Sequence, residues 1–246
     1  MQTLQPGCYY SAMRLREFPA TDIRALPNYS ILDGSHYLRI SPSTLKSWVV
    51  GRDYRVQSEE KRSRPLIAPA QDKPTLLLSF VNLVEAHVLD AMRHKHGVPL
   101  RRVRSALDYV QRQFGDKHPL ITQEFKTDGV HLFIEQLGAL IIASKGGQIG
   151  LRKVFEQHLE RIEHDEKGIA LRLFPFTRPS HAEQPKIIVI DPRFSFGRPV
   201  IVGSGIPTRA VFERYLAGES SDHLAEDFRR TREEIDEAIR CEASVA

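Results

Sequence analysis

The chain has 246 residues, a length that favours two or three domains over one small core. No apolar run approaches the roughly 20 residues of a membrane-spanning helix, and the first residues lack the apolar centre of a signal peptide. The two cysteines, Cys8 and Cys241, stand near opposite ends and indicate neither a disulfide framework nor a thiolate metal site. We therefore expect a protein of the reducing cytoplasm with no membrane partner.

Charge is distributed unevenly along the chain, although the net charge of +4 is modest. Residues 28–64 hold seven lysines and arginines against four acids, whereas residues 209–246 hold six against ten. A basic front and an acidic tail indicate different partners for the two ends. The alternative is a pair of solvated helix faces.

Residues 1–27 are expected to form a loosely packed leader. The stretch 29–51 then predicts two short helices joined by a tight turn. Ser41 is typical of an N-cap and Pro42 of the first helical position, because a proline there lacks only an amide that has no helical partner. The inward face of the second helix carries three apolar residues at helical spacing: Leu45, Trp48 and Val49.

The outward face of that second helix carries short polar side chains and one cation, which can hydrogen-bond base edges and hold phosphates. Its predicted DNA-contacting residues are Ser43, Thr44, Lys46 and Ser47. Residues 53–67 then predict two short strands around a basic loop, a wing. The cations of this segment would supply salt-dependent phosphate contacts: Arg52, Arg55, Lys61, Arg62 and Arg64. The alternatives are an ordinary helical hairpin and a solvated hairpin tip.

The middle of the chain predicts two helices followed by a small antiparallel sheet. The helices cover residues 76–96 and 98–114. The predicted strands are 121–125, 130–135 and 139–143, with Thr127-Asp128-Gly129 as the turn between the first two. Lys145-Gly146-Gly147-Gln148 predicts a turn before a helix that reaches Ile162, and residues 168–174 predict a further strand.

No residue pattern in the chain predicts catalysis, a cofactor or a metal site. His94 and His96 do not share a helix face, and no carboxylate or cysteine pattern joins them or His118. The one compact group of histidines and glutamates has the wrong spacing for a metal site on one helix face, so we interpret it as a charged outer face: His158, Glu160, Glu163 and His164. We expect a protein that is not an enzyme.

The end of the chain predicts a short β-hairpin and three short helices. Residues 186–190 and 200–202 can pair as strands, with Gly203-Ser204-Gly205 as a turn. Helices are predicted from Pro207 to about Leu216, from Ser220 or Ser221 to Phe228, and from a capping box at Thr231 to Glu234 onwards. These helices predict another small helix-turn-helix-like unit.

Two segments resemble known families. The front is similar to the MerR-type winged helix-turn-helix, on Tyr29, Ser30, Leu38, Ile40, Ser43, Thr44, Leu45 and Trp48. It departs at Asp33-Gly34-Ser35, where that family has good helix formers, and this glycine predicts a short or shifted first helix. The end resembles the bacterial domain-of-unknown-function family 433, on Gly197, Arg198, Pro199, Val200, Ile201, Gly203, Ile206, Pro207, Gly218, Leu224, Ala225, Phe228, Thr231, Glu234, Ile235 and Ala238. It has Ser204-Gly205 where that family has Thr-Arg, and Arg209 is a candidate substitute for the missing arginine.

Together the two segments resemble VapB-type antitoxins. The resemblance implies a protein that binds and silences a PIN-like ribonuclease toxin and represses its own operon, with Arg198 and Arg209 as toxin-binding residues. We expect a homodimer on double-stranded DNA of its own operator, because two half-sites multiply affinity and specificity. The alternative is a MerR-like transcriptional regulator without a toxin partner.

The predicted fold class is α+β and mainly α. It comprises an N-terminal winged helix-turn-helix, a small middle β-sheet with a helix, and a C-terminal three-helix domain with a short β-hairpin. The predicted divisions are a leader at 1–27, a DNA-binding domain at 28–115, a middle segment at 116–178 and the C-terminal domain at 179–246.

Overall fold

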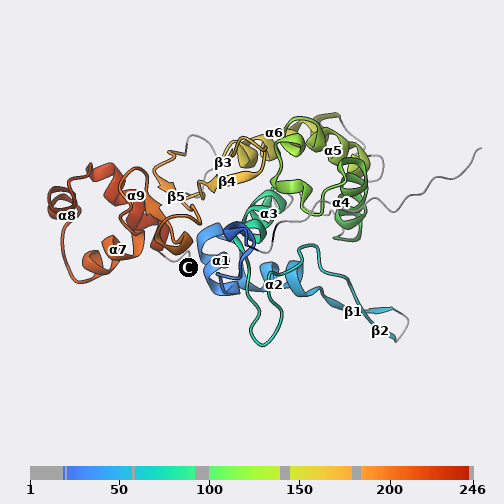
Figure 1. Ribbon diagram of the computed structural model, residues 1–246, viewed down its shortest axis with the longest axis horizontal. Coiled ribbons are helices and arrows are strands. Elements are labelled where there is room, and N and C mark those ends of the chain that lie inside the picture. The colour runs from blue at the N-terminus through green and yellow to red at the C-terminus, as the bar shows by residue number, and fades with distance from the viewer. Residues whose placement is uncertain are drawn as a thin grey trace, which may run out of the picture.

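The computed structural model describes residues 19, 21–56, 59–91, 100–138, 145–178 and 184–243 (Figure 1). The described part is mainly helical and has three two-stranded antiparallel sheets. None of its helices combines the length and the apolar character that a membrane crossing needs.

The two predicted front helices are present as α1, Ile31–Leu38, and α2, Pro42–Val50, after a 3₁₀ turn at Ile23–Ala25. Ser30 and Asp33 form a capping box at the start of α1. Ser41 caps α2, because its hydroxyl oxygen accepts a hydrogen bond from the Thr44 amide at 3.3 Å. The predicted wing strands follow as β1, Asp53–Val56, and β2, Glu59–Arg62, which pair antiparallel.

Gly34 lies in the middle of α1 and has a packing role. A Cβ atom at this position would lie 3.1 Å from each of the side chains of Leu45, Leu78 and Leu83. The glycine therefore lets α1 approach α2 and the next helix closely, which compensates for its poor helix propensity. The first helix is short, at eight residues.

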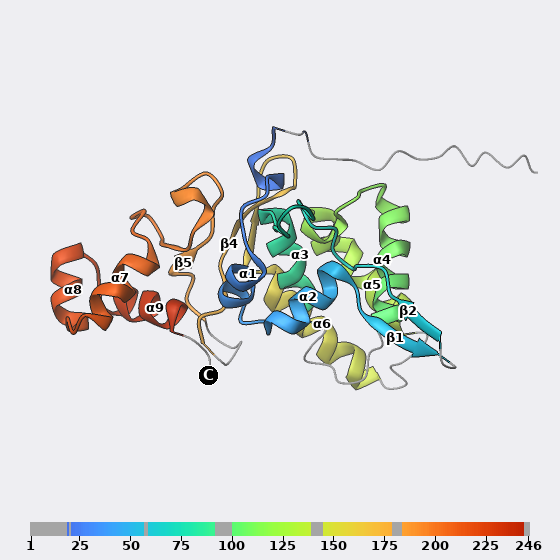
Figure 2. The same ribbon diagram turned by 90° about the horizontal axis from the view of Figure 1, so that it is seen from below.

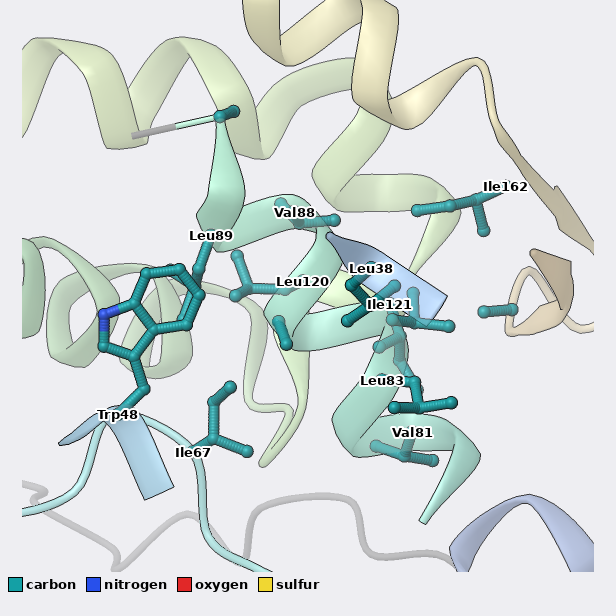
Figure 3. Packing of buried hydrophobic residues seen from close by; sticks show 14 of the residues in the cluster. Leu38, Trp48, Ile67, Val81, Leu83, Val88, Leu89, Leu120, Ile121 and Ile162 are labelled. Atoms are coloured by element: carbon teal, nitrogen blue, oxygen red, sulfur yellow. The ribbon is translucent and has the colours of Figure 1, made fainter. Parts of the chain in front are cut away.

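Helix α3, Phe80–Asp90, is the centre of the main core, and all of its residues are buried. Figure 3 shows Val81, Leu83, Val88 and Leu89 of α3 among apolar side chains from segments that precede and follow α3 in the sequence. Trp48 and Ile67 come from the front segment, whereas Leu120, Ile121 and Ile162 come from the middle. One core is thus continuous from Tyr29 to Ile190 and crosses the predicted boundary at residue 115.

The middle segment differs from its prediction. After α4, Leu100–Phe114, and a 3₁₀ turn at Pro119–Ile121, the stretches predicted as strands form a π-helical turn at Phe125–Gly129 and helix α5, Val130–Gly138. The prediction of strands at 121–125 and 130–135 with a turn at Thr127-Asp128-Gly129 was therefore wrong. The third predicted strand, 139–143, lies outside the described residues.

The physical reason is the helical spacing of the apolar residues. Val130, Phe133 and Ile134 are buried at positions i, i+3 and i+4. Phe133 packs edge-to-face against Phe125 and Phe155, with ring centroids 6.1 and 5.6 Å apart. This aromatic cluster can form only if the segment is helical, and it outweighs the local turn signal.

Helix α6, Lys145–Leu159, includes the residues predicted as a turn before it, so that turn was also wrong. Ile162 belongs to β3, Ile162–His164, which pairs antiparallel with β4, Ala170–Leu173. The strand predicted at 168–174 is thereby confirmed. A bridge between Leu173 and Ile190 then leads to the last unit.

The C-terminal unit has its own small core. Strands β5, Ile188–Val189, and β6, Val200–Ile201, pair antiparallel around a 3₁₀ turn, η4, at Ser195–Gly197. Helices α7, Thr208–Leu216, α8, Ser221–Phe228, and α9, Arg232–Glu242, follow close to their predicted bounds. Their buried residues form a cluster separate from the main core: Ile188, Ile201, Val211, Leu224, Ile235, Ala238 and Cys241. Figures 1 and 2 show this unit and the β1–β2 hairpin at opposite ends of the molecule, with α1 between them.

Candidate nucleic-acid interface and an adjoining groove

The outward face of α2 carries the polar residues predicted from the sequence. Leu45, Trp48 and Val49 are buried, so the opposite face of the helix points to solvent. Ser43 and Lys46 are exposed on that face. Among the described residues Lys46 forms no ion pair, which leaves its ammonium group available for a phosphate.

Thr44 and Ser47 are partly committed to α2 itself. The Thr44 hydroxyl accepts a hydrogen bond from Ser41 at 2.8 Å, and the Ser47 hydroxyl donates to the Thr44 carbonyl at 2.7 Å. Both side chains are half-buried. Ser43 and Lys46 are therefore the more accessible pair of the four predicted residues.

The β1–β2 hairpin is held against the end of α2. The amides of Leu66 and Ile67 both donate to the Trp48 carbonyl, at 2.7 and 3.1 Å. Gly51 has a φ of +84°, and a Cβ atom there would collide with the Ser63 carbonyl oxygen. Only glycine allows this close approach, which places the hairpin beside the exposed face of α2.

Arg62 and Arg64 are the described cations at the base of the hairpin, and Arg52 at its start is exposed as well. Arg62 donates from Nε and Nη2 to the Val50 carbonyl at 3.3 and 3.2 Å, so its guanidinium lies over the end of α2. Arg64 lies 3.5 Å from Asp108 of α4. The side chains of Arg55 and Lys61 lie outside the described residues. The described cations therefore lie on the exposed face of α2, at Lys46, and along the hairpin that follows it, at Arg52, Arg62 and Arg64.

The two predicted toxin-binding arginines lie elsewhere, on a groove between α1 and the C-terminal unit. Arg198 donates from Nη1 to the Tyr37 hydroxyl at 3.0 Å and lies 3.2 Å from Asp33, both in α1. Arg209, at the start of α7, donates from Nε to Glu213 at 2.7 Å. The groove has a volume of about 800 Å³, and both arginines line it.

Polar contacts join the front segment to the C-terminal unit beside the groove. The Tyr29 hydroxyl donates to the Gly197 carbonyl at 3.0 Å, and Asn28 donates to the Phe196 carbonyl at 2.7 Å. His36 lies 3.3 Å from the buried carboxylate of Glu242. Burial alone would raise the pKa of Glu242, but hydrogen bonds from His36 and Thr208 hold that pKa below its usual range.

Two apolar residues on the groove were missed by the sequence analysis. Leu32 of α1 is 69% exposed, and Phe196 of η4 is 88% exposed. The signal for Phe196 was present, because an aromatic residue stands in a turn-rich segment between two arginines, at Arg193-Phe194-Ser195-Phe196-Gly197-Arg198. For Leu32 the signal was that it is an apolar residue on the face of α1 opposite to the buried residues.

The group predicted as a charged outer face is in part a buried site, so that prediction was wrong. His158 is fully buried. Its Nδ1 donates to the Val154 carbonyl at 2.8 Å, and its own carbonyl accepts from His87 Nε2 at 2.9 Å. Glu160 alone of the four is exposed. The cause is the position of His158 on the inward face of α6, one residue before Leu159.

His87, buried beside His158, was not singled out from the sequence. Burial, followed by the neighbouring His158, lowers the pKa of His87 to about 3, so the ring is neutral at physiological pH. His118 lies 2.8 Å from Glu85, and although burial opposes this, the carboxylate raises the pKa of His118 above its usual value. His94 and His96 lie outside the described residues. Within the described ranges, no three metal-ligating side chains gather into a group that could hold an ion.

Comparison with known proteins assigns the class of the front segment. Residues 27–107 match the family model described as "Putative DNA-binding HTH domain", which is a helix-turn-helix domain. Residues 188–240 match the model described as "Protein of unknown function (DUF433)".

Relatives in Mycobacterium tuberculosis match nearly the whole chain. The chain is 29% identical over 232 residues to the protein named "Putative antitoxin VapB45", which covers 87% of this chain and 93% of that protein. It is also similar to the crystal structure of Rv2018, with a TM-score of 0.65 and 25% identity over 87% of this chain and 98% of that one. The predicted resemblance to VapB-type antitoxins, with a helix-turn-helix at the front and a family 433 segment at the end, is confirmed.

Proposed function

We propose that this chain is a DNA-binding antitoxin that represses its own operon and neutralises a PIN-like ribonuclease toxin. The DNA-binding part is supported by one observation above all. The segment that matches a helix-turn-helix model carries exposed cations on α2 and in the hairpin that follows it: Lys46, Arg52, Arg62 and Arg64. The antitoxin part is supported by the similarity to "Putative antitoxin VapB45" over most of both chains.

In this proposal α2 enters the major groove and the β1–β2 hairpin acts as a wing. Ser43 and Lys46 contact base edges or phosphates, and Thr44 and Ser47 contribute where their hydroxyls reach the DNA. Arg52, Arg55, Lys61, Arg62 and Arg64 hold the backbone, which gives affinity and salt dependence without reading sequence. A homodimer would place two such surfaces on two half-sites of the operator in the cytoplasm.

The toxin is proposed to dock on the C-terminal unit, through Arg198 and Arg209. Arg209 is the better candidate to face a metal-binding carboxylate site, because it is exposed and at the start of α7. The excess of acids in residues 209–246 makes this end unsuited to DNA, since phosphates repel it.

The test of DNA binding is fluorescence anisotropy with a duplex from upstream of the gene and a scrambled duplex, at two salt concentrations. Lys46→Ala and Arg62→Ala should each weaken binding to the specific duplex several-fold and reduce the salt slope by about 1. Arg232→Ala, which removes an exposed arginine in the acidic unit, is the matched control and should leave binding unchanged. Equal, weak binding to both duplexes by the wild-type chain would contradict the proposal.

A further inference from the structure

The groove between α1 and the C-terminal unit exposes apolar side chains on both of its walls. Leu32 belongs to α1, in the segment matched as a DNA-binding domain, whereas Phe196 belongs to η4. Both line the groove and both are mostly exposed. Large exposed apolar side chains gathered at one concave surface are typical of a protein-binding site.

The backbone that presents Phe196 is strained. Ser195 and Phe196 have φ values of +48° and +54°, a left-handed conformation that residues with a Cβ atom rarely adopt. Two such residues in succession hold Phe196 in a position where it is mostly exposed to solvent. Backbone strain of this kind is concentrated at binding and catalytic sites. Here the hydrogen bond from Asn28 to the Phe196 carbonyl holds the strained turn in place.

The most exposed charged side chains that line the groove are those of two arginines. The side chains of Arg198 and Arg209 are 45% and 67% exposed, whereas those of Asp33 and Glu242 are 33% and 6% exposed. Arg209 bonds Glu213 through Nε, and its two terminal amino groups have no bonding partner among the described residues. Such a pair of amino groups can hold a carboxylate in a bidentate arrangement.

We propose that this groove receives a segment of the partner toxin in which an apolar side chain stands beside a carboxylate. The apolar side chain packs between Phe196 and Leu32, and the carboxylate binds Arg209. This inference rests on the proposed antitoxin function and adds that α1 of the DNA-binding domain forms one wall of the toxin site. The exposed face of α2 is not part of the groove lining, so the toxin and DNA contacts use different residues.

The test measures the dissociation constant of the full chain for the PIN-like protein encoded beside its gene. Phe196→Ala and Leu32→Ala should each raise the dissociation constant at least tenfold. Phe194→Ala, in the same loop, and Leu216→Ala, as exposed as Leu32, are matched controls outside the groove and should change it less than twofold. All four variants should keep the wild-type affinity for the upstream duplex.

A second variant separates a binding role of Phe196 from a structural one. Phe196→Gly removes the ring and relaxes the positive φ, so it should raise the thermal midpoint while still weakening toxin binding. If Phe196→Ala, Leu32→Ala and the wild-type chain all bind the toxin equally well, the groove is not the toxin site, but the proposed antitoxin function is unaffected. No binding of the toxin by the wild-type chain would overturn both.

Discussion

The two ends of this molecule are supported by different cores. The DNA-binding end rests on a large core shared with the middle segment, so α2 and its hairpin are carried by many buried side chains. The C-terminal unit has a small core of its own. It is joined to the rest by polar contacts, by the Leu173–Ile190 bridge, and by the packing of Phe174 with Val189 and Val200. The predicted DNA-contacting surface therefore rests on the large core, whereas the groove lies where the front segment meets the C-terminal unit.

Two further side chains, which do not line the groove, also form hydrogen bonds between the C-terminal unit and the rest of the described chain. Arg161, which is buried, donates to the carbonyls of Phe174, Pro175, Gln184 and Pro185 and so fixes the chain on both sides of residues 179–183. Glu237 of α9 accepts hydrogen bonds from Thr177, from Arg178 Nε at 2.6 Å and from Arg240 at 2.6 Å. Single substitutions of Arg161 or Glu237 can therefore test how the C-terminal unit is held to the rest of the protein.

The largest expected effect on stability comes from a cavity-forming substitution, made separately in the main core and in the C-terminal core. Phe155→Ala in the main core should lower the free energy of unfolding by about 3–5 kcal/mol and impair DNA binding, because α2 rests on that core. Ile235→Ala in the C-terminal core should cost about 2–5 kcal/mol in the unfolding of that unit alone and leave DNA binding intact. Urea unfolding followed by Trp48 fluorescence and by circular dichroism distinguishes the two. Loss of both signals in one transition for Ile235→Ala would mean that the two cores are a single cooperative unit.

A smaller effect is expected from the joint itself. Glu237→Gln removes the charge that Thr177, Arg178 and Arg240 surround, and should destabilise the C-terminal unit by about 1–2 kcal/mol, since both arginines keep access to water. Burial raises the pKa of Glu237, but the hydrogen bonds from Thr177 and the arginines outweigh it and hold the pKa below its usual range. A carboxylate with a lowered pKa stabilises the fold above the ordinary glutamate range, and this stability is lost as the pH falls through the folded-state value.

The corresponding measurement is the thermal midpoint of the C-terminal unit between pH 7 and pH 3. The wild-type midpoint should fall at acid pH more steeply than that of Glu237→Gln. Parallel curves for the two proteins would show that Glu237 carries no net charge stabilisation at the joint.

An effect of similar size, but seen only as the pH falls, is expected from the neutral histidine in the main core. The folded-state pKa of His87, about 3, lies below that of an unfolded histidine, so the unfolded chain binds a proton that the folded chain does not. The free energy of unfolding is therefore hardly affected by protonation of His87 at pH 7, and it decreases progressively as the pH falls from about 6.5 towards 3. His87→Gln, which can keep the donor to the His158 carbonyl, should reduce the loss of stability between pH 7 and pH 5 by about 2 kcal/mol. An equal loss of stability in wild type and variant, measured by urea unfolding, would show that His87 does not cause the pH dependence.

The elements with strong local signals could be predicted from the sequence. Ser41 with Pro42 at the start of α2, and the capping box of Thr231 and Glu234 at the start of α9, fix helix starts within a few residues. The helix α5 could not be recognised in this way, because Thr127-Asp128-Gly129 mimics a hairpin turn. Only the packing of Phe133 on Phe125 and Phe155 decides between helix and strand there.

The two candidate sites also differ in how far they could be predicted from the sequence. The residues proposed to contact DNA are close together in the sequence, so they could be proposed before the fold was known. The groove joins Tyr37 to Arg198, which are 161 positions apart, and no short pattern contains both. The sequence indicated Arg198 and Arg209 through a family resemblance, but it could not place them on one groove with Leu32 and Phe196.

Hydrogen exchange with mass spectrometry, on the full chain with and without a duplex from upstream of its gene, tests the central claim most directly. The claim is that DNA is held by α2 and the β1–β2 hairpin, at the end of the molecule away from the C-terminal helices. Saturating duplex should slow exchange in peptides that cover residues 41–66 and leave peptides that cover residues 208–243 unchanged. Protection confined to residues 208–243, or none in residues 41–66, would contradict it.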